Sequence, residues 1–527
     1  MAILPDSTAE VQGRNRELSA LTASASPATR KLFIGVIEAL SRLQLDGASP
    51  EANARYERLE AELQRASERT YHEARQAMED LLRTTNRMRS TDLATSASTA
   101  RGPSYSRFAW LLGVAGSDDP DAAGTFDEFA QGAAHWYAES LIHLIANPTD
   151  SHLLGIHPWT THARMEPEGI RFRWVCHLVA TGIDAWATEQ GGSIAEMFGQ
   201  GQIVRFSEEI GRALPLPGKK VLVSLHPAVL TAMTAPRATP ASFSNLVEGS
   251  GPELRPLIDL DGEIHVGNAS ALVFGLDVVL ISAIKEIHGS DAQGDAFEYL
   301  CNHIAQELLP PDIHTFRDSF VSDSMTSPDG DEVDLHLRAK GIDVIIEAKS
   351  YLPAKDAASA AASYDQLLGA NKQIRKRVSR LQSGCWIRRR RPEQGDHVSG
   401  LVAVLHGYSA QVWRPQAMVE SGVPAFIAMP LQAFTIFLGC LRSADDLKSF
   451  MRLRNDMGAA GISGGDELEF LLGWMSGWTP ESFPRVDGAI IQVRPYFIET
   501  HNQISASWED VESWRQLLFE VSKPVHA

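Results

Sequence analysis

The stretch from Glu332 to Lys349, EVDLHLRAKGIDVIIEAK, restricts the possible fold more than any other part of the chain. Lys340-Gly341 separates two alternating segments, and a glycine in a two-residue loop is typical of a β-hairpin turn. If this turn sets the register, Asp334 lies opposite Glu347. Side chains of a strand alternate between its two faces, so Lys349 shares the face of both carboxylates. Residues that lie opposite each other have Cβ atoms roughly 5 Å apart.

The other face of this hairpin is uniformly apolar. In the same register, Arg338 and Asp343 form a favourable cross-strand ion pair. A slip of one residue would put apolar and charged side chains on the same face, so the register is strongly specified. The apolar cross-strand pairs are Val333/Ala348, Leu335/Ile346 and Leu337/Val344.

Two opposed carboxylates repel each other unless a positive charge lies between them, and Mg²⁺ is the cation that this pattern favours. Mg²⁺ takes oxygen ligands and is commonly held by one or two carboxylates with waters and substrate phosphates. Lys349 would lie beside the metal-bound water, where it orients the water or stabilises charge on phosphorus. The hairpin therefore predicts phosphoryl chemistry, with Asp334 and Glu347 as ligands of Mg²⁺ or of Mn²⁺ as a substitute.

An acid followed after 12 residues by E-x-K on a hairpin, with another acid on a preceding helix, resembles the PD-(D/E)XK nuclease superfamily, which has the restriction-endonuclease-like fold. The preceding helix is GDAFEYLCNHIAQELL, whose apolar residues recur at helical spacing. The resemblance implies that Glu298 on this helix is an additional metal-site residue. It also implies a supporting glutamine on the next helix, with Gln373 as the first candidate and Gln366 as the second. The resemblance covers roughly residues 291–450.

Other interpretations of the same residues stay open. E-x-K alone is expected by chance on the order of once or twice in a chain of this length, and an exposed hairpin with solvated charges would carry the same residues. Pro328-Asp329 reproduces the proline-aspartate pair of the family but lies too far upstream to face Glu347. Asp331 lies closer and competes with Asp334 for the role of metal ligand.

The segment from Lys372 to Arg391 is strongly basic, although the chain has a formal net charge of −18. Phosphate contacts supply most of the non-specific affinity for nucleic acid, so a local cationic strip is sufficient on an acidic protein. A solvated helix face and an exposed loop are the alternative interpretation. The predicted nucleic-acid-binding residues are Lys372, Arg375, Lys376, Arg377, Arg380, Arg388, Arg389, Arg390 and Arg391.

Composition and apolar segments are consistent with a cytoplasmic enzyme. The 4 cysteines are isolated, which suits a reducing compartment and argues against a zinc ribbon. The first residues lack the basic and apolar regions of a signal peptide. The longest apolar stretch, AFIAMPLQAFTIFLGCL, is too short and too interrupted to span a membrane. We expect a buried strand there, followed by one core helix over 431–454.

Four regions are expected along the chain. Residues 1–105 form a helical region that ends in a linker, and the apolar seam over 49–89 has coiled-coil spacing, so it forms a homo-oligomer or packs within the chain. Residues 106–290 are a mixed α/β region of unknown function. Residues 291–457 form the nuclease-like domain, and 458–527 a glycine-rich connector with a helical tail. The expected fold class is α/β, with a restriction-endonuclease-like mixed sheet of four or more strands, flanked by helices, in the C-terminal half.

The predicted function is Mg²⁺-dependent hydrolysis of phosphodiester bonds, with DNA favoured over RNA as the substrate. The resemblance makes defence against foreign DNA the expected setting, with repair as an alternative. Asp334, Glu347 and Glu298 are the predicted metal ligands, and Lys349 and Gln373 complete the predicted catalytic set. A non-cleaving nucleic-acid-binding or scaffold protein that keeps the fold is the second hypothesis. A helical interaction protein that uses residues 49–89 is the third.

Overall fold

The chain divides into two compact units. Unit 1 comprises Met1–Glu166, Glu208–Ala283 and Pro353–Ala357, and unit 2 comprises Pro167–Ser207, Ile284–Leu352 and Ala358–Ala527. The predicted hairpin lies in unit 2. The computed structural model describes residues 20, 22–27, 114–117, 173–213, 221, 225–237, 254–260, 262–267, 271–272, 275–321, 328–353, 357–383, 386–387, 396–405, 427–460, 462–463, 467–482 and 491–492.

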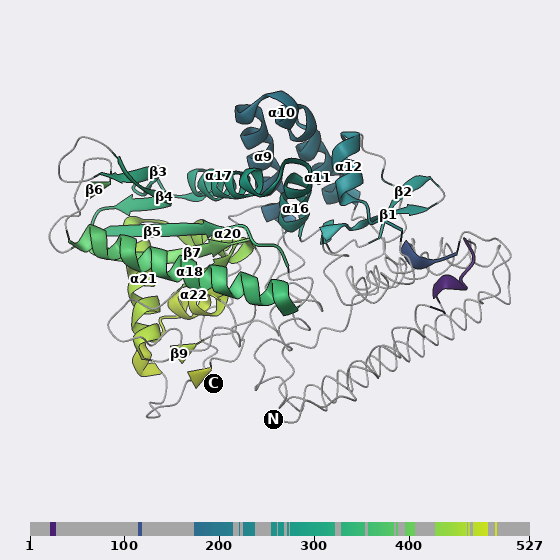
Figure 1. The fold of residues 1–527 in the computed structure, drawn as a ribbon. Helices are drawn as coiled ribbons and strands as arrows, with labels where there is room; N and C mark the ends of the chain where they lie inside the picture. Colours follow the sequence, from purple (N-terminus) through teal and green to yellow (C-terminus); the bar gives the residue numbers. More distant parts are fainter. Residues whose placement is uncertain are drawn as a thin grey trace. The chain divides into compact units, whose positions relative to one another are not determined.

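A six-stranded mixed sheet forms the centre of unit 2 (Figure 1). Its strands are β3 (His314–Val321), β4 (Pro328–Ala339), β5 (Ile342–Lys349), β6 (Trp386–Ile387), β7 (His397–Val404) and β8 (Ala428–Pro430). The strand order is β6-β3-β4-β5-β7-β8. The pairs β6–β3, β3–β4 and β4–β5 are antiparallel, whereas β5–β7 and β7–β8 are parallel. β5 therefore lies where the antiparallel part of the sheet meets the parallel part.

The β4–β5 hairpin has the register that its sequence predicts. Ala339 pairs with Ile342 across the two-residue turn, and the pairing continues to Leu335 and Ile346. Gly341 in the turn has φ of 81°, a left-handed conformation that glycine adopts without steric cost. The six predicted apolar partners are all buried: Val333, Leu335, Leu337, Val344, Ile346 and Ala348.

β5 is buried along almost its whole length, from Ile342 to Ala348. It has a neighbouring strand on each edge and helices over both faces, so neither face reaches solvent. This position explains its nearly continuous apolar run. It also places the two carboxylates of the strand, Asp343 and Glu347, in the interior of unit 2.

Helices cover both faces of the sheet (Figure 1). α18 (Ala357–Gln382) crosses one face, and its side chains Ile374 and Val378 lie directly over Gly400 of β7. α17 (Ser290–Leu308) packs against β3, β4 and β5 and against α20 (Leu431–Cys440), which contacts β7 and β8. α21 (Ala444–Ala459) packs against β5, and α22 (Glu467–Met475) packs against both α20 and α21.

The predicted strand followed by a core helix is confirmed by β8 and the fully buried α20. The prediction of one helix over 431–454 is wrong, because α20 ends at Cys440 and α21 begins after Ser443. The Ser443 side chain accepts a hydrogen bond from the backbone N–H of Asp446, whose carboxylate accepts one from the backbone N–H of Arg442. This reciprocal cap satisfies amides at a new helix N-terminus, so the chain turns and a second helix starts.

Unit 2 also contains α9 (Arg173–Gln190) and α10 (Gly192–Phe198), and α9 packs against α17. Residues well upstream of 291 therefore belong to the same compact unit as the sheet. β1 pairs antiparallel with β2, and β9 pairs parallel with β10. The bounds of these strands and of the remaining elements are α11 (Gln202–Ala213), α12 (Pro227–Met233), β1 (Leu257–Leu260), β2 (Glu263–Val266), α16 (Leu276–His288), β9 (Ile462–Ser463), the 3₁₀ helix η1 (Pro480–Ser482) and β10 (Ile491–Gln492).

Helices and a mixed sheet in the C-terminal half confirm the predicted α/β class. The seam over 49–89 and the run Arg388 to Arg391 lie outside the described residues, so what the sequence indicates for them stays a prediction. Within the part of the chain that the structure describes, no helix is both long enough and apolar enough to cross a membrane.

Candidate functional site

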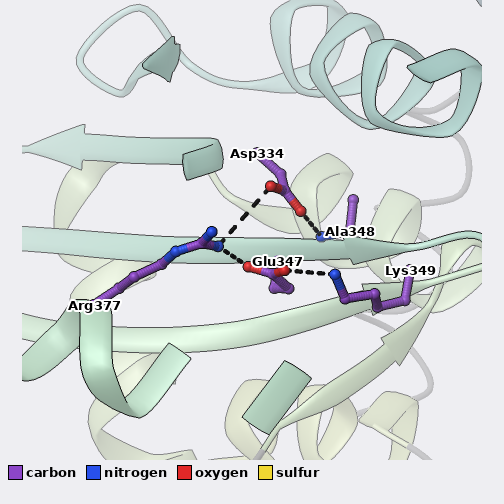
Figure 2. Close-up of polar contacts among 5 residues, drawn as sticks. All are labelled: Asp334, Glu347, Ala348, Lys349 and Arg377. Atoms are coloured by element: carbon purple, nitrogen blue, oxygen red, sulfur yellow. Dashed lines mark hydrogen bonds and ion pairs between the residues drawn. The ribbon is translucent and has the colours of Figure 1, made fainter. Parts of the chain in front are cut away.

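Asp334, Glu347 and Lys349 lie together at one end of the hairpin (Figure 2). Asp334 is the residue just beyond Leu335/Ile346, the β4–β5 ladder pair farthest from the turn. Its Oδ2 accepts a hydrogen bond from the backbone N–H of Ala348 at 2.8 Å. Lys349 Nζ lies 2.6 Å from Glu347 Oε1. The structure therefore brings together the three hairpin residues that the sequence predicts, in the predicted register.

Arg377 of α18 joins the two carboxylates (Figure 2). Its Nη1 lies 3.9 Å from Asp334 Oδ1 and forms an ion pair with Glu347 Oε2. The exposed fractions of the side chains are 7% for Arg377, 12% for Asp334 and 2% for Glu347. A buried charge is costly unless an opposite charge compensates it. Arg377 and Lys349 supply that compensation for Glu347.

A second charged cluster lies on the same hairpin face, nearer the turn. His336 Nε2 and Arg338 Nε both lie 2.7 Å from Asp343 Oδ1, and the side chains of His336 and Asp343 are buried. Burial raises the pKa of Asp343, but the hydrogen bond and charge of His336, together with Arg338, outweigh it and leave this pKa below its ordinary value. The predicted Arg338–Asp343 ion pair is confirmed.

Gln293 ties α17 to the end of β5. Its side chain is buried, and its Nε2 donates a hydrogen bond to the carbonyl oxygen of Ser350, the residue that follows Lys349. Its burial excludes water from competing for that hydrogen bond. This contact fixes the backbone where the chain leaves the candidate site.

The other predicted catalytic residues lie on the helices α17 and α18. Glu298 is half-buried on α17, whereas Gln373 and Gln366 are exposed on α18. Among the residues with described positions, no group of three or more His, Cys, Asp or Glu side chains is arranged to hold a metal. Asp334, Glu347 and Glu298 are therefore not arranged as a metal site of three carboxylates.

The basic residues of α18, between Lys372 and Arg380, differ in how far their side chains are exposed to solvent. Lys372 and Lys376 are exposed, and Arg375 and Arg380 are half-buried. Arg377 is buried against the hairpin carboxylates. Lys372 and Lys376 therefore lie on the solvent side of α18, whereas Arg377 is engaged inside unit 2.

The sequence interpretation lacks the inward position of Arg377 and the burial of His336. The signal for Arg377 is its phase on α18, because it lies in register with the buried residues Leu367, Ala370, Ile374 and Leu381. The signal for His336 is its place on the hairpin face of Asp334 and Arg338, diagonally across from Asp343.

Asp334 and Glu347 have the donor chemistry that a hard divalent cation needs, because two carboxylates with waters and phosphate oxygens form a common Mg²⁺ site. Asp334 Oδ1 and Glu347 Oε2 both face Arg377 Nη1. The Arg377 guanidinium therefore lies at the position where Asp334 and Glu347 would share a cation. By charge and by donor type, the two carboxylates fit Mg²⁺ or Mn²⁺.

The candidate site consists of Asp334, Glu347 and Lys349 of the hairpin and Arg377 of α18. No protein-family model, curated protein or solved structure matches this chain.

Proposed function

We propose that this chain is a metal-dependent nuclease that hydrolyses phosphodiester bonds, with DNA as the favoured substrate. The observation that carries the proposal is the pair of Asp334, which is half-buried, and Glu347, which is buried, with Lys349 Nζ 2.6 Å from Glu347. Holding a buried acid close to a second acid is costly for stability. That cost is expected where the group of charges has a chemical task.

The order of elements around the pair gives further support. A helix (α17), three antiparallel strands (β3, β4, β5), a second helix (α18), the short strand β6 and a parallel strand (β7) follow one another in the chain. The first helix, the β4–β5 hairpin, the second helix and the later strand occur in the order expected from the resemblance to the restriction-endonuclease-like fold. Within that fold, the acids and the lysine of the E-x-K hairpin are the catalytic residues, and defence against foreign DNA is the setting we favour.

In the proposed reaction, Asp334 and Glu347 would hold a divalent cation, which would act as a Lewis acid on a phosphoryl oxygen. The hairpin fixes both carboxylates on one rigid pair of strands, so the substrate phosphate is oriented without a large loss of entropy. Lys349 donates a hydrogen bond to the oxygen that gains negative charge as water attacks phosphorus. The bond from water oxygen to phosphorus forms while the ester bond to the leaving oxygen breaks. The attacking water gives a proton to solvent, and the leaving oxygen takes one from solvent.

A second candidate function is binding of nucleic acid without cleavage. The observation that favours it is the ion pair of Arg377 with Glu347, since a guanidinium there neutralises the carboxylates without any metal. The exposed Lys372 and Lys376 would still contact phosphates. The chain would then keep the arrangement of a nuclease as a binding scaffold.

One experiment separates the two functions. The purified chain is incubated with linear, supercoiled and single-stranded DNA and with RNA, each with Mg²⁺, Mn²⁺ or EDTA. Cleavage that requires metal and falls on the order of 100-fold or more in Glu347→Gln and Lys349→Met supports the nuclease. Arg452→Gln, an exposed change on α21, is the matched control for folding and charge. Binding that is sensitive to salt, without products in any metal, would support the scaffold instead.

A further inference from the structure

Arg377 occupies the position between Asp334 and Glu347 that a cation shared by these carboxylates would need. Its Nη1 pairs with Glu347 Oε2 and lies 3.9 Å from Asp334 Oδ1. From this placement we propose that Arg377 is a gate: it competes with the divalent cation for the two carboxylates, and it must move before the metal binds. The inference rests on the proposed function, because it concerns the metal site of that nuclease.

The burial of the group explains why a gate is needed. Glu347 is 1% exposed, so with no metal bound and Arg377 absent only Lys349 would compensate its charge, and the nearby Asp334 would add a second negative charge. Lys349 reaches Oε1 of Glu347 and Arg377 reaches Oε2. The guanidinium thus stabilises the metal-free state, in which the pair of acids would otherwise repel.

The gate comes from a different element than the carboxylates. Asp334 and Glu347 are fixed by the hairpin, whereas Arg377 reaches them from α18 on the end of a long side chain. Rotation of that side chain would release both carboxylates without a change in the sheet. The same helix carries the exposed Lys372 and Lys376, so a phosphate backbone bound there would lie close to the released guanidinium.

Competition has a quantitative consequence for metal affinity. When a competent state is only a fraction of the population, the apparent dissociation constant is the intrinsic one divided by that fraction. If the guanidinium holds the carboxylates in nine of ten molecules or more, its removal would tighten metal binding by about tenfold or more. If Arg377 instead favoured metal binding, its removal would weaken the affinity for the metal.

Direct binding of Mn²⁺ tests this, measured by the loss of the free-ion signal in electron paramagnetic resonance. We expect Arg377→Met to bind Mn²⁺ at least about tenfold more tightly than the unmodified chain. Arg377→Lys keeps a positive charge there and should stay near the unmodified affinity. Adding Glu347→Gln to Arg377→Met should abolish the gain, and Arg452→Met should leave the affinity unchanged.

Thermal unfolding is the second measurement, and it keeps the proposal testable if Arg377→Met folds poorly. Arg377→Met should be less stable than the unmodified chain without metal, and Mn²⁺ should raise its unfolding temperature more than that of the unmodified chain, because a ligand stabilises the state that binds it. A variant that stays unfolded with Mn²⁺ present would overturn the gate and make Arg377 a structural residue.

The remaining outcomes separate the gate from the nuclease. Equal or weaker Mn²⁺ binding by Arg377→Met, together with metal-dependent cleavage by the unmodified chain, would overturn the gate and leave the nuclease intact. Neither binding nor cleavage by any form would overturn both proposals.

Discussion

One carboxylate oxygen in the hairpin, Oδ1 of Asp343, lies 2.7 Å from both His336 Nε2 and Arg338 Nε. The pKa of Asp343 lies below its ordinary value, because these partners outweigh the effect of burial. A carboxyl with a lowered pKa in the folded state stabilises that state above its unfolded pKa of about 3.9. The contribution is lost as the pH falls through the lower pKa of the folded state.

Asp343→Asn should therefore lower the free energy of unfolding at neutral pH, on the order of 2 kcal/mol, since it removes hydrogen bonds to a charged group. The gap to the unmodified chain should narrow as the pH falls below about 4. Urea unfolding followed by tryptophan fluorescence at several pH values measures both effects. Asp456→Asn, an exposed change in the last turn of α21, is the control and should stay within about 0.5 kcal/mol. A gap that is constant with pH would contradict the assigned role of Asp343.

At this scale the sequence was informative where local rules decide. A two-residue turn and a period of two are sufficient to predict the shared face of Asp334, Glu347 and Lys349. The sequence predicts Arg377 as a nucleic-acid contact, because the basic residues around it dominate the pattern. Its burial depends on a partner in another element, Glu347, which lies 30 positions earlier in the chain.

Among the elements, the β4–β5 turn depends on a single residue. Gly341 has φ of 81°, and a Cβ added there would lie 2.7 Å from Lys448 Nζ. Gly341→Ala should destabilise unit 2 by roughly 1–2 kcal/mol, because a left-handed backbone is unfavourable for alanine. Gly294→Ala in α17 should do the opposite, by about 0.5–1 kcal/mol, since a Cβ there meets nothing within 4 Å. Thermal unfolding of the two variants compares them, and a shift of the same sign in both would refute the argument.

The docking of α18 depends on another glycine. A Cβ on Gly400 would collide with Ile374 and Val378 of that helix. Gly400→Ala should cost roughly 1–3 kcal/mol by overpacking, and it should lower the protection of α18 amides in hydrogen exchange. Adding Ile374→Ala removes the colliding group and should restore part of the loss. If the double variant is no better than the sum of the singles, the contact does not hold α18 in place.

The elements themselves were predicted unevenly. The strands β5, β7 and β8 follow from their apolar runs. β3 was not predicted, because its ladder with β4 shifts register between Phe316 and Asp318 and again between Ser319 and Val321. Such bulges break the period of two on which strand prediction relies. The sequence pattern does not predict the break between α20 and α21 for a similar reason, since one capping serine starts a new helix within a continuous apolar periodicity.

For the whole molecule, the net charge of −18 opposes binding to a polyanion, so any such binding must come from a local surface. The outward lysines of α18 are that surface in our proposal. Lys372→Gln with Lys376→Gln should weaken DNA binding for all sequences alike. The slope of log affinity against log salt should fall by about 2, near 0.9 for each lost phosphate contact.

Fluorescence anisotropy with labelled duplexes over a range of salt concentrations measures that slope. Arg452→Gln on α21 removes one exposed positive charge from a helix on the other face of the sheet and is the control. An unchanged slope in the double variant would show that the exposed part of α18 does not contact phosphates.

The position of β5 between an antiparallel and a parallel neighbour also determines when the site can assemble. The hairpin joins β4 to β5 through two residues, and such hairpins close within about 1–10 μs. The parallel pairing of β5 with β7 must wait for the 26 residues of α18 to be in place. Asp334 and Glu347 are therefore expected to come together before Arg377, which neutralises them, is in position. Pulse-labelled hydrogen exchange during refolding should show protection of 335–346 ahead of 398–404, and simultaneous protection would contradict this order.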